Sequence, residues 1–360
     1  TKYATMRIPA LVCSKKGTLL AFCEARTAMG DYAEMDLVMR RSTDGGRTWG
    51  ETMVIAPREA KRPTSNCTPI VDADGRTIHL LYQRGYSNCY YIRSVDDGKT
   101  WSAPTEITYA FEKFRPEYNW KVLAPGPGHA IQLRLGKHHG RLVVPVWLCE
   151  PNPNIPGGVH RPSCAATIFS DDFGKTWQRG DIVANHGDRV GADTLRNPSE
   201  HVAVELTDGR VMLNIRNESA PNRRLIAYSA DGATGWTKSF DDELFDPICM
   251  ASQIRVSGLK KGEKTQVVFV NPDSEADPER LNKMGARKRQ NLTAKVSFDD
   301  GQTWPVEKVL DPGKAGYSDL AVGPDGMMYC LYETNESATA NAWRYQLVLK
   351  RFNLAWLMTP

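Results

Sequence analysis

The chain has 360 residues, of which 41% are hydrophobic and 24% charged, and a formal net charge of +4 at pH 7, which are proportions typical of a globular protein. Its length allows either two ordinary domains or one large all-β domain. No apolar run reaches the roughly 18 residues that a membrane-spanning helix needs, and basic residues are not interleaved with aromatic residues as on nucleic-acid-binding surfaces. We therefore expect no membrane span and no nucleic acid as a partner.

The N-terminal segment MRIPALV, residues 6–12, predicts a buried strand that contains one arginine, Arg7. A guanidinium stays charged at any ordinary pH and is costly to bury without a partner. Arg7 is therefore either a surface residue at a strand edge or the ligand of an anion. The following segment, CEARTAMGDYAEMD at residues 23–36, leads into a loop with three carboxylates, Asp31, Glu34 and Asp36.

A short motif of the form S-x-D-x-G-x-T-W occurs four times in the chain. The copies are STDGGRTW (42–49), SVDDGKTW (94–101), SDDFGKTW (170–177) and SFDDGQTW (297–304), and a decayed copy, SADGATGW, lies at 229–236. Short Ser and Asp side chains can bond the backbone of a turn, Gly supplies the positive φ of a tight hairpin, and Trp anchors the hairpin by burial. Because an apolar strand precedes each copy, we interpret the motif as the turn of a β-hairpin, with a structural role.

The serines of the five copies, at 42, 94, 170, 229 and 297, lie 52, 76, 59 and 68 residues apart. This spacing suits one four-stranded sheet for each copy, or about six sheets in the whole chain, and long helical periodicity is nearly absent. The sequence thus predicts an all-β fold, a six-bladed β-propeller with four-stranded antiparallel blades, formed by residues 1–360 as a single domain. The last strand, in YQLVLKRFNL at 345–354, would close the ring beside the N-terminal segment.

Two further features concern the cysteines and a loop. None of the eight cysteines forms a C-x-x-C pair, and several lie in apolar runs, so that buried free thiols are expected and zinc-binding spacing is absent. The segment WLCEPNPNIPGGVHRPSC at 147–164 is rich in Pro and Gly, which predicts a rim loop.

The segment EHVAVELTDGRVMLNIRN, residues 200–217, predicts a hairpin whose first strand alternates between apolar and polar residues. Glu200 has the parity of the apolar face and lies at its end, whereas Glu205 has the opposite parity and is expected to be solvated. If Asp208 and Gly209 form a two-residue turn, Glu200 pairs with Asn217, one residue from Arg216.

With its motif copies, RIP at 7–9 and several ordered segments, the chain resembles the sialidases (neuraminidases), and bacterial exo-sialidases in particular. The further segments are GPGHAIQL (126–133), GRLVVPVW (140–147), RQNLTAKVSFDDGQTW (289–304) and YSDLAV (317–322). The resemblance covers nearly the whole chain. It implies a catalytic propeller that hydrolyses terminal α-linked sialic acids of glycoconjugates with retention, without a cofactor or metal, and its partners would be sialylated glycans or free sialosides.

The resemblance implies that three arginines clamp the carboxylate of the sugar: Arg7 in RIP, Arg216 in LNIRN and Arg289 in RQNLT. The residue type suits this role because a planar guanidinium binds a carboxylate through two hydrogen bonds and keeps its charge. Arg287 is an alternative to Arg289 because it lies two residues away with the same strand parity. Glu333, in CLYETN, would orient Arg7.

The resemblance also places the catalytic groups. Asp31 matches the general acid, whereas Glu34 and Asp36 are expected to be solvated. Tyr317, in GYSDL, matches the nucleophile, and Glu200 would be its base. A tyrosine nucleophile is a known exception among glycosidases, and a neutral phenol avoids repulsion by the carboxylate on the anomeric carbon, but it needs a base.

Further residues by resemblance are Arg26 and Asn66, which match positions near the 4-hydroxyl and N-acetyl groups of the sugar, and Met250 in CMAS, which replaces a polar amide at the pocket wall. Met250 leaves open a trans-sialidase or a hydrolase that prefers another nonulosonic acid. A non-catalytic glycan-binding propeller is the remaining alternative.

We expect a secreted, periplasmic or cell-surface location. The sequence indicates neither linkage preference nor oligomeric state.

Overall fold

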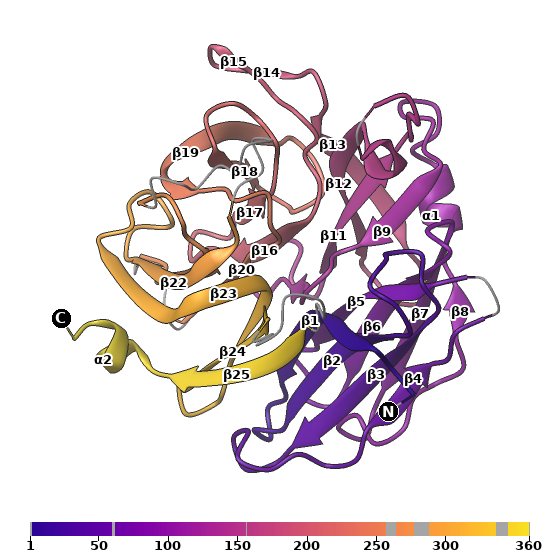
Figure 1. Cartoon of the computed structure of the whole chain (residues 1–360), viewed down its shortest axis with the longest axis vertical. Helices are drawn as coiled ribbons and strands as arrows, with labels where there is room; N and C mark the ends of the chain where they lie inside the picture. Colours follow the sequence, from indigo (N-terminus) through magenta and orange to yellow (C-terminus); the bar gives the residue numbers. More distant parts are fainter. Residues whose placement is uncertain are drawn as a thin grey trace.

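Antiparallel β-sheets form nearly all of the regular structure in the computed structural model, which describes residues 2–59, 62–155, 157–256, 264–276, 288–335 and 345–359. In Figure 1 the sheets follow one another around a common centre in chain order, from indigo to yellow. The first two sheets each have four strands in sequence order. Their strands are β1 (Thr5–Cys13), β2 (Leu19–Arg26), β3 (Met35–Ser42) and β4 (Met53–Ala56), then β5 (Thr64–Val71), β6 (Ile78–Arg84), β7 (Asn88–Ser94) and β8 (Thr105–Glu106).

The third and fourth sheets continue the ring. The third consists of β10 (Ile131–Gln132), β11 (Leu142–Cys149), β12 (Ser163–Ser170) and β13 (Gln178–Asn185), and β9 (Val122–Pro125) also pairs with β11. The fourth consists of β16 (His201–Glu205), β17 (Val211–Ile215), β18 (Arg223–Ser229) and β19 (Thr237–Phe245). Between them lies a small ribbon of β14 (Arg189–Val190) and β15 (Asp193–Thr194). The short helices are α1 (Tyr109–Glu112), the 3₁₀ turn η1 (Gly158–His160) and α2 (Leu354–Leu357).

The last sheet corrects the prediction of six separate four-stranded blades. It is one six-stranded sheet, and its strands are β20 (Ser252–Arg255), β21 (Val267–Pro272), β22 (Gln290–Ser297), β23 (Val306–Val322), β24 (Met328–Thr334) and β25 (Gln346–Phe352). The described residues therefore form five blade sheets, because β23 continues without a break for 17 residues. Its first part pairs with β22 and its second part with β24, which joins into one sheet what the spacing of the motifs had predicted as two.

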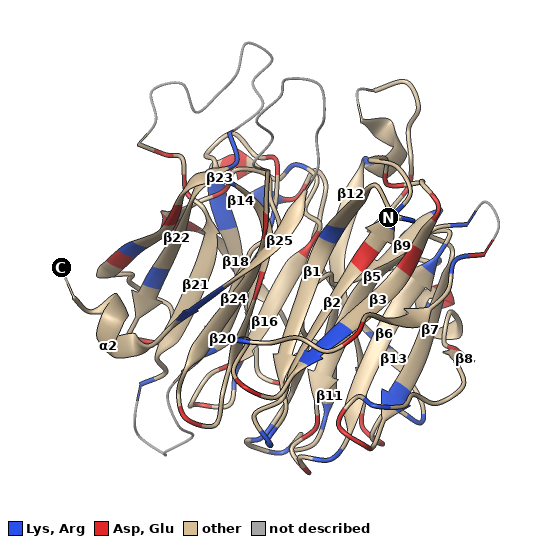
Figure 2. Ribbon diagram, turned by 60° about the horizontal axis from the view of Figure 1, so that its bottom comes forward, with Lys and Arg blue, Asp and Glu red and all other residues tan. Residues whose placement is uncertain are grey.

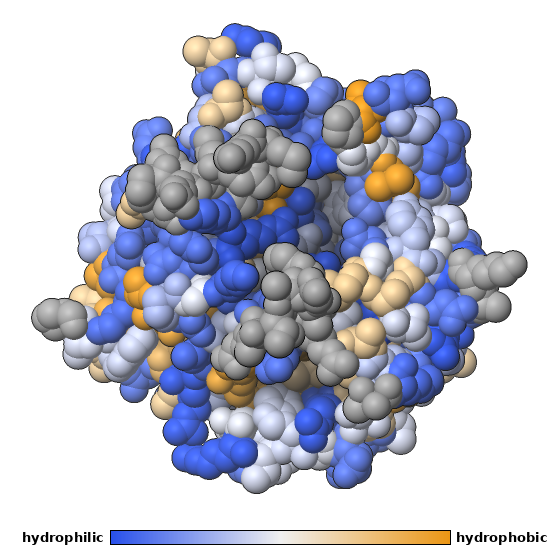
Figure 3. Space-filling view, in the orientation of Figure 1, coloured by the Kyte–Doolittle hydropathy of each residue, from blue (hydrophilic) through white to orange (hydrophobic). Residues whose placement is uncertain are grey.

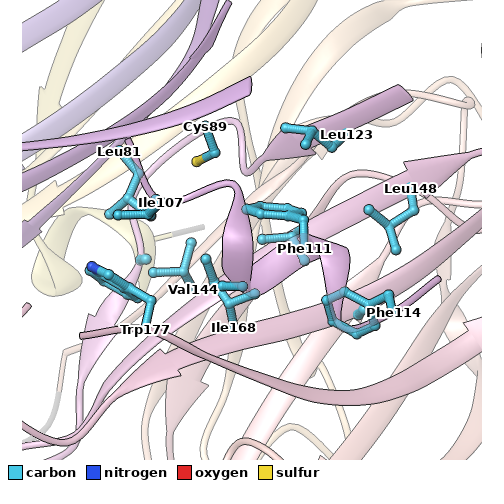
Figure 4. Packing of buried hydrophobic residues seen from close by; sticks show 14 of the residues in the cluster. Leu81, Cys89, Ile107, Phe111, Phe114, Leu123, Val144, Leu148, Ile168 and Trp177 are labelled. Atoms are coloured by element: carbon cyan, nitrogen blue, oxygen red, sulfur yellow. The ribbon is translucent and has the colours of Figure 1, made fainter. Parts of the chain in front are cut away.

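The ring is closed as expected, beside the N-terminal strand. Thr5 Oγ1 donates to the carbonyl oxygen of Tyr345 at 3.2 Å and accepts from its backbone N–H at 3.1 Å. Apolar faces of neighbouring sheets pack together all around the ring, as Figure 4 shows for Leu81 and Ile107 on one side and Leu148 and Ile168 on the other. Figure 2 shows that charged residues lie mostly at strand ends and in the connecting segments.

The repeated motifs have the predicted structural role. In the first copy, Ser42 Oγ donates to Asp44 Oδ1 at 2.8 Å and accepts from the N–H of Gly46 at 2.9 Å, while Asp44 accepts from the N–H of Thr48. The copies that begin at 94, 170 and 297 repeat these bonds. Gly46 has a φ of +80°, which is why the motif needs glycine there.

The remaining expectations for the scaffold concern thiols and membranes. All eight cysteines are free, and all but Cys13 are buried, as predicted. Among the described residues, no helix is long and apolar enough to cross a membrane.

Candidate active site

A cavity of about 310 Å³ lies among the inner strands of the sheets and the loops at one end of the ring. Figure 3 shows the recess near the centre of this face, bordered largely by hydrophilic residues. The structure brings to this cavity most of the residues that the sequence predicted as a site: Arg7, Arg26, Asp31, Asn66, Glu200, Arg216, Arg289 and Tyr317. They come from positions up to 310 residues apart in the chain. Closure of the ring makes them neighbours.

Arg7 is held by Glu333, as the sequence analysis expected. Its Nε and Nη2 donate to Glu333 Oε1 at 3.0 Å and Oε2 at 3.1 Å, respectively, in a two-point ion pair. The same carboxylate accepts from the backbone N–H of Ile8 at 2.8 Å and of Tyr317 at 3.2 Å. Glu333 is fully buried, and all four of its bonds come from donors, so that a carboxylate satisfies every one of them.

A β-bulge explains how an arginine enters an otherwise apolar strand. The pairing of β1 with β2 shifts register between Arg7 and Ala10, so that Ile8 and Pro9 oppose one residue of β2. Ile8 has a φ of +57°, which is unfavourable for a β-branched residue. The bulge re-aims Arg7 into the cavity while the following apolar residues still face the core.

Tyr317, Glu200 and Arg216 form one hydrogen-bonded group. The phenol of Tyr317 donates to Glu200 Oε1 at 2.5 Å, and Arg216 Nη1 donates to the phenolic oxygen at 2.7 Å and to Glu200 Oε2. Burial, the largest influence, raises the pKa of Tyr317 well above its usual range, although the charge of Arg216 opposes this. The phenol is therefore protonated in the free protein, with a carboxylate in place to take its proton.

The hairpin that carries Glu200 and Arg216 differs from its predicted register by one residue. His201 pairs with Ile215, so Glu200 lies opposite Arg216 rather than Asn217. The reason is the turn: Leu206 N–H donates to Arg210 O at 2.8 Å, so three residues connect the strands, with Gly209 at a φ of +88°. The correction brings the carboxylate directly opposite the arginine.

Three expectations about side-chain environment were wrong. Glu205 is buried, and its carboxylate accepts from the backbone N–H groups of Arg134 and Leu135 at 2.8–3.0 Å. Asp36 is also buried, and it accepts from Lys2 Nζ at 3.0 Å and from the backbone N–H of Arg58 at 2.8 Å. Strand parity shows on which face of a sheet a side chain lies, and a loop position shows that it lies outside a sheet. Neither shows which other segments of the chain cover the side chain. Glu34 is exposed, as expected.

Met250 is the third correction, because it does not line the cavity. It is fully buried and packs with Ile8, Cys249 and Tyr317 behind the cavity wall. A flexible apolar side chain fills this space and supports the strand segments that carry Arg7 and Tyr317. Its effect on the sugar would therefore be indirect.

Arg289 lies beside the ring of Tyr317. Its guanidinium carbon is 5.6 Å from the ring centroid, and that of Arg7 is at the same distance. Arg289 Nη2 donates to the carbonyl oxygen of Ile248, which fixes the side chain at the cavity. Arg287, the alternative third arginine, lies outside the described residues.

Asp31 lies on the loop that follows β2, near both Arg26 and Arg7. Its Oδ1 accepts from Arg26 Nη1 at 2.9 Å and is 3.9 Å from Arg7 Nη1. Arg26 is buried and is itself held by Glu24, whose Oε2 accepts its Nε at 2.8 Å and Nη2 at 2.6 Å. Glu24 Oε1 in turn accepts the backbone N–H of Asn66 at 2.9 Å, so this residue is placed at the cavity by the same network.

His160 is a cavity residue that the sequence analysis missed, although the loop that carries it was predicted at the rim. Its Nε2 is 3.3 Å from the hydroxyl of Tyr32, and its ring lies 5.0 Å from that of Tyr86 and 5.3 Å from that of Trp147. Arg161, next to it, is paired with Glu218 at 2.6 Å. The Pro- and Gly-rich insert was the available signal, but a loop has no periodicity that would show which side chain faces the cavity.

The fold and these contacts define a propeller whose cavity holds arginines, carboxylates and a hydrogen-bonded tyrosine, and comparison with known proteins gives its family. Residues 5–330 match the model of the BNR repeat-like domain. The chain is 34% identical to a sialidase of Micromonospora viridifaciens over 99% of its own length and 52% of that protein, and 30% identical to Sialidase-2 of Cricetulus griseus over 91% and 89% of the two chains. The Hadza microbial sialidase Hz136 superposes with a TM-score of 0.77 at 25% identity, over 99% of this chain and 67% of that one.

The chain belongs to the sialidase family with BNR repeats. It spans about half the length of the Micromonospora viridifaciens relative.

Proposed function

We propose that this chain is a retaining exo-α-sialidase, in which residues 1–360 act as one catalytic propeller on terminal α-linked sialic acids. The observation that carries the proposal is the 2.5 Å bond from the Tyr317 phenol to Glu200, made within reach of the three predicted clamp arginines. A buried phenol with a raised pKa needs such a base to become a nucleophile. Family membership supports the same reaction.

The three arginines bind the carboxylate on the anomeric carbon. Arg7 is preorganised by Glu333, Arg216 by Glu200, and Arg289 by the carbonyl of Ile248, so little side-chain freedom is lost when the substrate binds. The clamp fixes the anomeric carbon close to the hydroxyl of Tyr317, because the guanidinium carbons of Arg7 and Arg289 each lie 5.6 Å from the centroid of that ring.

In the first step, the Tyr317 oxygen attacks the anomeric carbon while Glu200 takes the phenolic proton. Asp31 gives its proton to the glycosidic oxygen, whose bond to the anomeric carbon breaks. In the second step, Asp31 removes a proton from water, which attacks the anomeric carbon and releases Tyr317, and Glu200 returns the proton to the phenol. Two displacements at one carbon give net retention.

The test is release of free sialic acid from a fluorogenic α-sialoside, with the first anomer formed followed by NMR. We expect turnover and the α anomer as first product. A β anomer would contradict the covalent tyrosine mechanism, and absence of turnover with binding of sialylated glycans would indicate the non-catalytic alternative. Lactose added as an acceptor detects transfer in place of hydrolysis. Donors with different C5 substituents detect a preference for another nonulosonic acid.

Replacement of Arg289 by alanine is expected to lower kcat/KM by at least about a hundredfold, because a charged contact to the substrate carboxylate is lost. The matched control is Arg287→Ala, since both changes remove one guanidinium from the same short segment. Loss of turnover in Arg287→Ala alone would show that the third arginine of the clamp is Arg287.

A further inference from the structure

Asp31 has the wrong protonation state for a general acid in the free protein. Partial burial favours its neutral form, but the charge and hydrogen bond of Arg26 and the charge of Arg7 outweigh this and keep the pKa of Asp31 below its usual range. The distances are 2.9 Å from Arg26 Nη1 and 3.9 Å from Arg7 Nη1. An ionised carboxylate cannot protonate a leaving group, so something must load Asp31 with a proton.

The charges of the described residues around the clamp balance one another before substrate binds. Among the described residues, four guanidinium groups and four carboxylates lie at the clamp or directly brace it: Arg7, Arg26, Arg216, Arg289, Glu24, Asp31, Glu200 and Glu333. Arg7 and Arg26 share ion pairs with Glu333, Asp31 and Glu24, Arg216 pairs with Glu200, and Arg289 donates to the carbonyl oxygen of Ile248. The nearby ion pair of Arg161 and Glu218 is neutral as a pair. His160 is neutral as well, because burial lowers its pKa. A substrate carboxylate therefore brings one uncompensated negative charge.

We propose that binding of the substrate carboxylate draws one proton from solvent onto Asp31, so that the substrate itself loads the general acid; this inference rests on the proposed function. The incoming anion occupies Arg7, one of the two cations that stabilise the Asp31 carboxylate. It also places a second negative charge near Asp31, and both effects favour the protonated form. The proton taken up is the one that the leaving oxygen receives.

Asp31 accepts this proton because the other carboxylates are held by donors on both oxygens. Glu333 accepts four N–H bonds and is fully buried. Glu24, whose pKa is raised by burial, nevertheless accepts three N–H bonds and has no solvent-exposed surface. Glu200 is bonded by Arg216 and the Tyr317 phenol. The side chain of Asp31, by contrast, is 46% exposed, so a proton can reach it from solvent.

Proton uptake has a definite pH dependence. Below the pKa of Asp31 in the free protein, the group is already protonated, and above its pKa in the complex it stays ionised. Between these two values, affinity for a carboxylate ligand rises as pH falls. Arg26, which is hydrogen-bonded to Asp31, limits how far the pKa of Asp31 can rise.

The experiment is calorimetric titration of the full chain with the unsaturated glycal of N-acetylneuraminic acid, in buffers of different ionisation enthalpy and over a range of acidic to neutral pH. We expect uptake that approaches about one proton per ligand at acidic pH and vanishes as pH rises. Asp31→Asn should still bind the glycal, since the residue is on an exposed loop, but without uptake. His160→Gln, which removes the imidazole of the cavity, should keep the uptake.

Binding of the glycal without proton uptake at any pH, or undiminished uptake in Asp31→Asn, would overturn this inference and leave the proposed function standing. Loss of uptake in His160→Gln alone would assign the proton to the imidazole and would also overturn it. Failure of the unaltered protein to bind the glycal would contradict the proposed function itself.

Discussion

Replacing Tyr317 by phenylalanine should lower kcat by at least about a thousandfold while the protein stays folded. The change removes only the hydroxyl, so the aromatic ring remains packed with Ile8, Cys249 and Met250 and near the guanidinium groups of Arg7 and Arg289. Arg216 and Glu200 remain bonded to each other without the phenol, so no buried charge is left without a partner. The variant therefore removes the proposed nucleophile and little else.

The matched control is Tyr345→Phe. The ring of Tyr345 lies 4.5 Å from the guanidinium carbon of Arg7, but Tyr345 does not line the cavity. We expect this variant to retain most of its turnover. The measurements are kcat with a fluorogenic α-sialoside and mass spectrometry of protein treated with a fluorinated sialoside that traps the covalent intermediate. Full activity of Tyr317→Phe would show that another group attacks the anomeric carbon.

The repeated hairpins could be predicted because their chemistry is local. Ser42, Asp44, Gly46 and Thr48 satisfy one another within a single turn, so the motif alone determines the bonds. The number of sheets could not be predicted in the same way. Whether two sheets share a strand depends on β23, which passes from one partner strand to the next even though it contains Asp311, Pro312 and Gly313, residues typical of a turn.

The members of the candidate site could be predicted far better than their contacts. Arg7, Arg216 and Tyr317 were found through motifs, yet the direct opposition of Glu200 and Arg216 depended on a turn of three residues where two were assumed. His160 was missed because its position is set by a loop that packs on aromatic rings from two other parts of the chain. Such contacts are made only in the folded ring.

Bulges are the physical reason why the site lies where the inner strands begin. Ile8 on β1 and Asn66 on β5 both have positive φ, and in both strands the register shifts at that point. A bulge turns the side chain before it away from the regular alternation. Parity arguments therefore hold along the apolar part of each strand and fail at the residues that face the cavity.

Replacement of Glu333 by glutamine should lower both stability and activity, the stability by about 3–5 kcal/mol, because a buried ion pair loses one partner. Each oxygen of Glu333 accepts two N–H bonds, one of them from Arg7, and the two backbone donors are Ile8 and Tyr317. An amide places an NH₂ group against donors at one of these positions and leaves Arg7 without its hydrogen-bonded counter-charge, so that only Asp31 at 3.9 Å remains. Arg7 and the backbone of the nucleophile are then both misplaced, for which we expect a loss in kcat/KM of about a hundredfold.

Glu205→Gln separates the two effects. Glu205 is also buried and accepts from the backbone N–H groups of Arg134 and Leu135 and from Arg255, but it does not line the candidate active site. Thermal unfolding should show a loss of stability in both variants, whereas kcat/KM of the folded protein should fall only in Glu333→Gln. If both variants lost stability and neither lost activity, Glu333 would be a core residue, and the orientation of Arg7 would be set by the bulge at Ile8 alone. A fall of kcat/KM in Glu333→Gln, but not in Glu205→Gln, would show that the Glu333 carboxylate aligns Arg7 with the proposed nucleophile.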